Sequence, residues 1–174
     1  MNLKKYTILI LVFFCSLHLT AQKDNYSFLK LIVFNKENKI MLVKWKGAWE
    51  IPGTRYNQPV TLSRFIDTLA SEHGITVQDK ELNGLFTFEY ENRTTFTIMY
   101  YYTTRYKAGE LITPESCEEI GWFAVEQALN LIPYREMRLI LTQITNNPVI
   151  VWGGAIKKYN DQSIQFTENF YPLH

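Results

Sequence analysis

Residues 49–75 read WEIPGTRYNQPVTLSRFIDTLASEHGI, and this stretch carries the clearest structural pattern in the chain. A loop punctuated by proline and glycine is followed by apolar residues at helical spacing. The residues of this apolar face are Leu62, Phe65, Ile66, Leu69 and His73. Thr61 or Ser63 can cap the start of the helix, and Gly74 can end it. We therefore expect a loop that leads into one amphipathic helix, with His73 as a core or helix-end residue.

The segments before this loop have the composition of β-strands. Residues 28–34 and 40–44 are rich in apolar and β-branched side chains, and the polar residues 35–39 separate them. Because the separating segment is short and polar, we expect the two strands to form a hairpin.

The segments after the helix predict further strands and a second helix. Strands are expected at residues 85–90, 94–105, 120–124 and 149–152, and a helix at residues 134–144. We expect Gly153 and Gly154 to form a turn and the remaining tail to be a loosely packed terminus. This order of elements predicts an α/β (α+β) fold, in which helices cover a mixed β-sheet.

The first residues have the pattern of an export signal. Lys4 and Lys5 precede an uncharged apolar run at residues 6–19, and Thr20-Ala21 provides a small-residue cleavage site. The run is short for a membrane span. We expect residues 1–21 to be a signal peptide and the protein to be periplasmic or secreted. The alternative is an uncleaved segment that anchors the protein in a membrane.

Charge and cysteine content exclude several classes of protein. The formal net charge of +1 becomes −1 when the two lysines of the signal are removed, so we expect no binding to nucleic acid and, after cleavage, none to a membrane. Cys117 is then the only cysteine, which excludes an internal disulfide. The sequence gives no indication of oligomeric state.

Trp49-Glu-Ile-Pro-Gly53, followed by a helix that ends at Gly74-Ile75, resembles the Nudix hydrolase family. The Glu-Glu-Ile-Gly-Trp-Phe segment that ends at Phe123 is also similar to Nudix sequences, and the resemblance covers roughly residues 28–145. It implies a Nudix-like mixed β-sheet sandwiched by helices. The expected organisation is a Nudix-like domain at residues 22–148 and a C-terminal extension at 149–174 that packs on the domain or trails from it.

The resemblance also implies a Mg²⁺ or Mn²⁺ site on the helix, where the family places glutamates on one face. Counting back from the glycine that ends the helix, the three ligand positions hold Thr68, Ser71 and Glu72. Pro59 and Asp67 occupy the positions of the family's upstream glutamate and its arginine. Glu72 is therefore the one metal ligand that the resemblance assigns. One carboxylate and two hydroxyls form a poor Mg²⁺ site, so we interpret the Nudix box as degenerate.

Other residues are candidates for the site by the same resemblance. Glu89, Glu91 and Glu119 could join Glu72 in catalysis, and the alternative is that they are solvated surface charges. The candidate ligand-binding residues are Trp49, Gly53, Arg55 and Tyr90. For the aromatic residues the alternative is packing in the core, and for the arginine it is an exposed surface.

Three functions remain open at this point. The first is an exported Nudix-fold protein that binds a nucleotide-like or diphosphate-containing small molecule with little Nudix-type hydrolysis. The second is a divergent Mg²⁺-dependent pyrophosphohydrolase that acts on nucleoside diphosphate derivatives. The third is a non-catalytic protein-interaction module.

Overall fold

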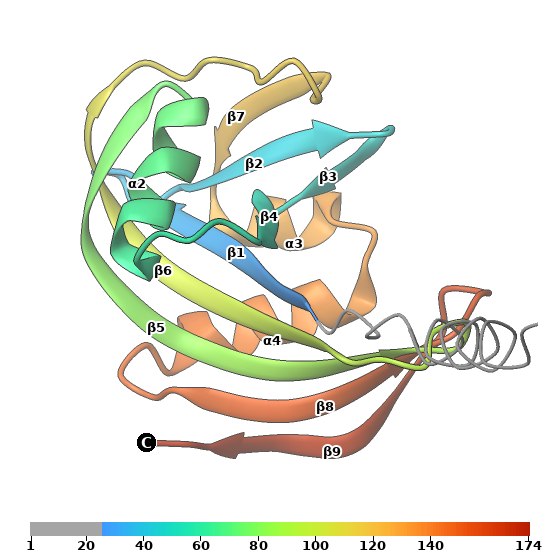
Figure 1. The fold of residues 1–174 in the computed structure, drawn as a ribbon. Helices are drawn as coiled ribbons and strands as arrows, with labels where there is room; N and C mark the ends of the chain where they lie inside the picture. The colour runs from blue at the N-terminus through green and yellow to red at the C-terminus, as the bar shows by residue number, and fades with distance from the viewer. Residues whose placement is uncertain (1–25) are drawn as a thin grey trace, which may run out of the picture.

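The computed structural model describes residues 26–174, which form one mixed nine-stranded sheet with helices on both faces (Figure 1). The strands are β1 (Tyr26–Phe34), β2 (Ile40–Trp45), β3 (Ala48–Glu50), β4 (Gly53–Tyr56), β5 (Ile75–Tyr90), β6 (Thr97–Gly109), β7 (Glu119–Phe123), β8 (Trp152–Lys158) and β9 (Ile164–Pro172). The helices of this range are α2 (Leu62–Glu72), α3 (Val125–Leu131) and α4 (Arg135–Asn146). The predicted signal peptide, residues 1–21, lies outside the described residues.

The order of strands along the sheet is β3-β2-β1-β6-β5-β8-β9, with β4 paired to β1 and β7 paired to β2. The β1–β6 and β5–β8 pairs are parallel, and the other pairs are antiparallel. The sheet is therefore mixed, as predicted. Within residues 26–174, no helix has the length and apolar character needed to cross a membrane.

Helix α2 forms where the sequence spacing predicts it. The hydroxyl of Thr61 accepts a hydrogen bond from the backbone N–H of Arg64 at 3.3 Å, which identifies Thr61 as the N-cap. Phe65 and Leu69 are buried on the predicted face. Gly74 follows the helix with a φ of +80°, a conformation that favours glycine, and this confirms the predicted end.

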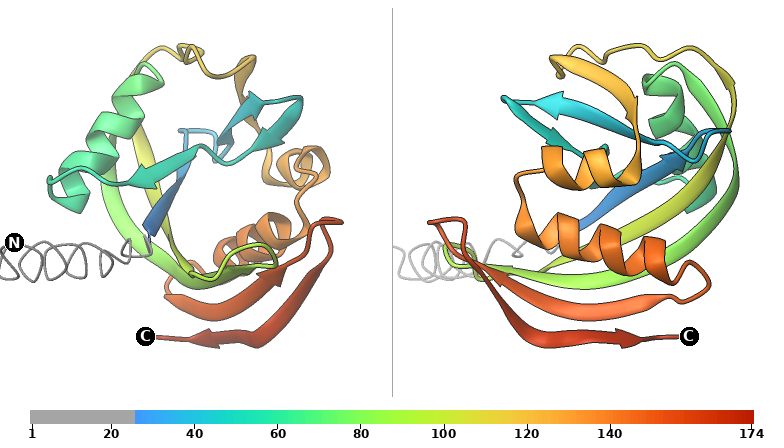
Figure 2. Two further views of the ribbon diagram at one scale, coloured as in Figure 1. Left: turned by 45° about the vertical axis from the view of Figure 1, so that its right-hand side comes forward. Right: turned by 180° about the vertical axis from the view of Figure 1, so that it is seen from behind.

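Two hydrophobic clusters lie on opposite faces of the sheet. Leu29, Leu31 and Val33 of β1 pack in the cluster under α2, whereas Ile32 packs in the cluster under α3 and α4. This division follows from the alternation of side chains along a strand. Seen from behind, α3 and α4 lie in front of the sheet (Figure 2). The predicted sandwich of helix, sheet and helix is confirmed; α3 is an additional helix that the sequence pattern did not predict.

The expected hairpin of the first two strands is splayed apart. Strands β1 and β2 share one residue pair, Phe34 with Ile40, and the first half of β1 pairs with β4 instead. Gly53 makes this exchange possible, because a side-chain carbon there would collide with the carbonyl oxygen of Leu29. The pairing places Ile51 and Pro52, which follow Glu50 at the end of β3, directly beside β1.

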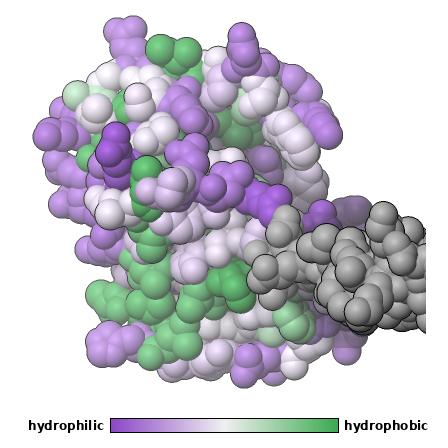
Figure 3. Space-filling model, in the orientation of Figure 1, coloured by the Kyte–Doolittle hydropathy of each residue, from purple (hydrophilic) through white to green (hydrophobic). Residues whose placement is uncertain are grey.

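The prediction of a loosely packed C-terminus is wrong, because residues 152–172 form two strands that extend the sheet. Strand β8 pairs in parallel with β5, and β9 pairs with β8. Gly153 and Gly154 lie inside β8 rather than in a turn, since the rings of Tyr171 and Phe170 lie where their side chains would be. Apolar residues gather on the surface over β5, β8 and β9, where Leu173 is 44% exposed (Figure 3).

Candidate functional site

A cleft of two adjoining pockets lies between the sheet, the loop before β4 and the helices. The inner pocket has a volume of about 320 Å³ and the outer pocket about 560 Å³. Phe28, Lys30, Glu50 and Tyr90 line both pockets and so form the passage between them. The inner pocket is also lined by Tyr26, Phe88, Thr97, Met99, Tyr101, Tyr134, Glu136, Met137, Lys158 and Gln162. The outer pocket extends to the C-terminal end of α2 and to the segment at residues 114–117.

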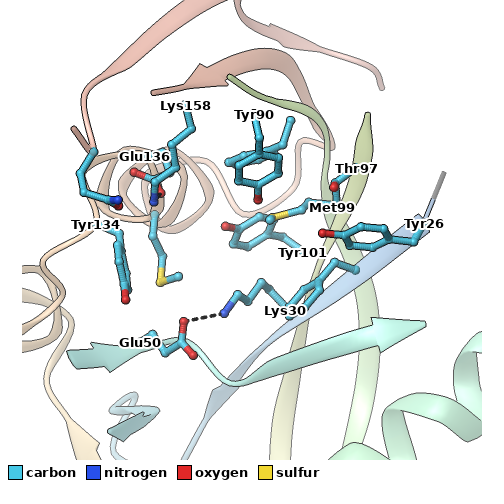
Figure 4. A pocket seen from close by; sticks show the side chains of 14 residues that line it. Tyr26, Lys30, Glu50, Tyr90, Thr97, Met99, Tyr101, Tyr134, Glu136 and Lys158 are labelled. Atoms are coloured by element: carbon cyan, nitrogen blue, oxygen red, sulfur yellow. Dashed lines mark hydrogen bonds and ion pairs between the residues drawn. The ribbon is translucent and has the colours of Figure 1, made fainter. Parts of the chain in front are cut away.

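Two ion pairs form part of the wall of the inner pocket (Figure 4). The ammonium of Lys30 lies 3.0 Å from a carboxylate oxygen of Glu50 and donates to the carbonyl of Ile51 at 2.8 Å. The ammonium of Lys158 lies 2.7 Å from the carboxylate of Glu136. Burial lowers the pKa of Lys30 because it removes water from the ammonium, and the neighbouring Glu50 carboxylate acts in the opposite direction. Each buried charge in this wall therefore has a partner of opposite sign.

Tyrosine hydroxyls supply the other polar atoms of the inner pocket. Burial raises the pKa of Tyr90 to about 12 and raises that of Tyr101 well above its ordinary value, so both phenols are neutral at physiological pH. The two hydroxyls point into the cavity (Figure 4). Within residues 26–174, neither hydroxyl has a hydrogen-bond partner in the protein. They can therefore donate hydrogen bonds to a ligand and accept them from it.

The predicted metal ligand Glu72 opens onto the outer pocket, which it shares with Glu50, a carboxylate that is ion-paired with Lys30. Glu72 lines the outer pocket and a smaller adjacent hollow that also contains Thr68. The Thr68 hydroxyl donates to the carbonyl of Arg64 at 3.1 Å, and Ser71 is exposed. Across residues 26–174, no three His, Cys, Asp or Glu side chains are placed together to bind a metal ion. The donors present near α2 therefore do not fit the Mg²⁺ or Mn²⁺ site that the resemblance implies.

The other candidate carboxylates lie away from Glu72. Glu89 and Glu91 line a separate surface hollow beside the turn between β5 and β6, and Glu91 accepts a hydrogen bond from the backbone N–H of Asn160 at 3.0 Å. Glu119 is ion-paired with Lys44 at 2.6 Å. The structure does not bring these three side chains into the same pocket as Glu72, and their catalytic role stays a prediction.

The candidate ligand-binding residues divide into two groups. Gly53 and Tyr90 line the cleft. Arg55 lines the small hollow beside Glu72, and its guanidinium lies 4.3 Å from the ring centre of Tyr26. Trp49 lines neither pocket, because its ring packs edge-on against Phe123 at a centroid distance of 4.9 Å. The structure thus assigns Trp49 to the border of the core.

The four charged residues of the inner pocket were not among the predicted site residues; they are Lys30, Glu50, Glu136 and Lys158. The sequence around Lys30 could have marked it as a candidate, because this charged residue interrupts an apolar strand between Leu29 and Leu31. No local pattern marks Glu136 or Lys158, because their ion pair joins α4 to β8 across 22 residues of sequence. His73 is buried as predicted, and its Nδ1 atom lies 2.6 Å from the carbonyl oxygen of Leu69.

Neither the models of known protein families nor the curated proteins give a match. Solved structures do match. A MutT protein from Bacillus halodurans superposes with a TM-score of 0.70 at 17% identity, over 84% of this chain and 96% of that chain. The NUDIX domain of Shewanella oneidensis NrtR, solved with ADP ribose, gives 0.63 at 13% identity, over 86% and 100% of the two chains. A UDP-X diphosphatase gives 0.57 at 16% identity, over 79% and 70%. These likenesses extend over most of the described elements, and the chain therefore has the Nudix fold.

Proposed function

We propose that this protein binds a nucleotide-like or diphosphate-containing small molecule in the two-part cleft and carries out little Nudix-type hydrolysis. The proposal rests on one observation. The protein has a pre-formed aromatic cleft, and helix α2 contributes one carboxylate, that of Glu72, to this cleft. A concave, largely apolar pocket with a few convergent polar groups is the usual form of a small-molecule site.

The ligand class is supported by the shape of the cleft and by the proteins that share the fold. Phe28 and Tyr90 offer flat aromatic surfaces at the passage, and Tyr101 offers a neutral hydroxyl inside. One matched structure holds ADP ribose, and another is described as a UDP-X diphosphatase. ADP-ribose and a UDP derivative each join a nucleoside to a second group through a diphosphate, and the cleft likewise has two compartments, of about 320 and 560 Å³.

Binding is expected to be measurable without turnover. Titration of the purified protein with ADP-ribose and UDP-glucose should raise its unfolding temperature, since a ligand at a hundred times its Kd adds about 2.7 kcal/mol of stability. Tyr90→Ala should weaken binding about tenfold, because it removes a ring worth about 1–3 kcal/mol if a base stacks on it. Tyr171→Ala, on the outer strand β9, is the matched control. If no compound in the panel stabilises the protein, the interaction-module function is favoured instead.

Turnover is expected to stay near the background rate, and Glu72→Gln is expected not to change it. A single carboxylate with its two neighbouring hydroxyl positions cannot supply the charge that a metal-assisted reaction requires. The measurement is product formation from ADP-ribose with Mg²⁺ or Mn²⁺, resolved by chromatography. Because Glu72 opens onto the cleft, the alternative of a divergent hydrolase makes the opposite prediction. Turnover that disappears in Glu72→Gln would establish that alternative.

We also propose that the protein is exported. The support is the basic, apolar and small-residue pattern of residues 1–21. The protein isolated from its native host is expected to begin near Gln22, as determined by N-terminal sequencing. A mature chain that begins at Met1 and fractionates with membranes would favour the anchored alternative.

A further inference from the structure

Arg93 lies on the turn between β5 and β6, at the edge of the outer pocket. Its guanidinium carbon lies 4.7 Å from the ring centre of Tyr90 and 5.6 Å from that of Tyr26, and the guanidinium donates a hydrogen bond to the Tyr26 hydroxyl. Such contacts hold an arginine by its flat faces and leave several N–H donors for another group. Arg93 is thus positioned at the cleft by two aromatic residues that also line the inner pocket.

Within residues 26–174, no acidic side chain neutralises the positive charge of Arg93. Over the part of the chain that the structure describes, no carboxylate lies within ion-pair distance of its guanidinium. The nearest acid in sequence, Glu91, accepts its hydrogen bond from the backbone of Asn160. Arg93 therefore retains the capacity to bind an anion.

The inner pocket does not offer a comparable position for an anion. Its two lysines are each paired with a glutamate, so the charges of its wall sum to zero. A phosphate placed inside would be desolvated without a cation of its own, which is unfavourable. The neutral hydroxyls of Tyr90 and Tyr101 instead suit an uncharged ring that carries hydrogen-bonding groups.

The ligand's anionic part needs a positive charge beside it. A metal ion on helix α2 does not provide that charge, because the donors of α2 do not fit a Mg²⁺ site. We propose that Arg93 binds the anionic part of the ligand directly, without a metal ion, while the uncharged ring of the same ligand lies in the inner pocket. Arginine is suited to this task, since its planar fork forms paired, charge-assisted hydrogen bonds to phosphate oxygens. The inference rests on the proposed function and adds how the two ends of the ligand are recognised.

Calorimetric titration of the full-length protein with ADP-ribose and with adenosine tests the inference, in buffer with EDTA and in buffer with Mg²⁺. Arg93→Gln should weaken ADP-ribose binding at least tenfold and leave adenosine binding unchanged. Arg93→Lys should recover part of the loss. Arg105→Gln is the matched control, because Arg105 also lies over an aromatic ring, Phe34, and bonds an asparagine side chain, but at a different pocket. Replacing Mg²⁺ with EDTA should leave the affinity of the wild type unchanged.

Each contrary result has a distinct meaning. ADP-ribose binding that requires Mg²⁺, or that is unaffected in Arg93→Gln, overturns the role of Arg93 and leaves the proposed function intact. Equal affinity of the wild type for adenosine and ADP-ribose also overturns it, because the anionic part would then contribute nothing. If the wild type binds neither compound, the inference fails, and the proposed function fails with it when UDP-glucose also leaves the unfolding temperature unchanged. Unchanged unfolding temperatures of the variants confirm that the comparison is between folded proteins.

Discussion

A chain truncated after Pro148 is expected to lose cooperative folding. The removed segment contains Ile156, which is fully buried, and Phe170, whose ring packs against Phe86 of β5 at a centroid distance of 5.6 Å. Truncation would also expose the whole edge of β5 that pairs with β8. Each large core side chain contributes about 2–5 kcal/mol, and a whole domain is stable by only about 5–15 kcal/mol.

Circular dichroism and thermal unfolding measure this effect. Ile156→Ala in the full-length chain should be destabilised by about 2–5 kcal/mol, and Val149→Ala, in which the parent residue is 89% exposed, should be close to wild type. A truncated protein that unfolds cooperatively within a few degrees of the full-length protein would contradict the prediction. It would show that residues 149–174 are an accessory to the domain rather than part of its core.

Glu50→Gln is expected to be one of the most destabilising single substitutions at the cleft. It leaves the ammonium of Lys30, whose side chain is 5% exposed, without its counter-ion. Removing one partner of a buried ion pair costs about 3–5 kcal/mol, because the remaining charge stays desolvated. Chemical denaturation measures the loss, and Glu119→Gln is the matched control, since its ion pair with Lys44 lies at the surface.

The double variant Lys30→Met, Glu50→Gln separates the loss of a charge partner from the loss of packing. Removing both charges should recover most of the stability lost in Glu50→Gln, because no unpaired ion remains in the wall of the pocket. If the double variant is as unstable as the sum of the two single variants, the pair acts through packing and not through charge. Ligand binding should weaken in Glu50→Gln as well, since Glu50 belongs to the passage between the two pockets.

The local pattern of residues 49–75 was enough to predict the loop, the helix and its end. The cap at Thr61, the buried face of α2 and the left-handed conformation of Gly74 are all determined by nearby residues. Local interactions of this kind are visible in sequence because they repeat at the period of the helix. The same helix is also predicted to have a depleted acidic face, with Glu72 as the carboxylate at a ligand position.

Strands were harder to delimit, because bulges interrupt their alternation. Strand β5 begins at Ile75, ten residues before the predicted start, and register shifts occur near Asp79 and Gly84. A bulge moves the following side chains to the other face and so removes the period of two that sequence analysis detects. The C-terminal strands were misjudged for a related reason, since the glycines of β8 look like a turn until the rings that cover them are known.

By itself, the sequence determined the amphipathic helix α2, the flanking strands and the Nudix-like order of elements. The tertiary structure alone determined the cleft. It placed Lys30 against Glu50, Lys158 against Glu136, and Arg93 against Tyr26, pairs that are 20, 22 and 67 residues apart. Such contacts leave no period in the sequence, because they depend on which strands become neighbours in the sheet rather than on spacing within one element. The residues that we propose for ligand recognition could therefore be selected only after the fold had brought them together.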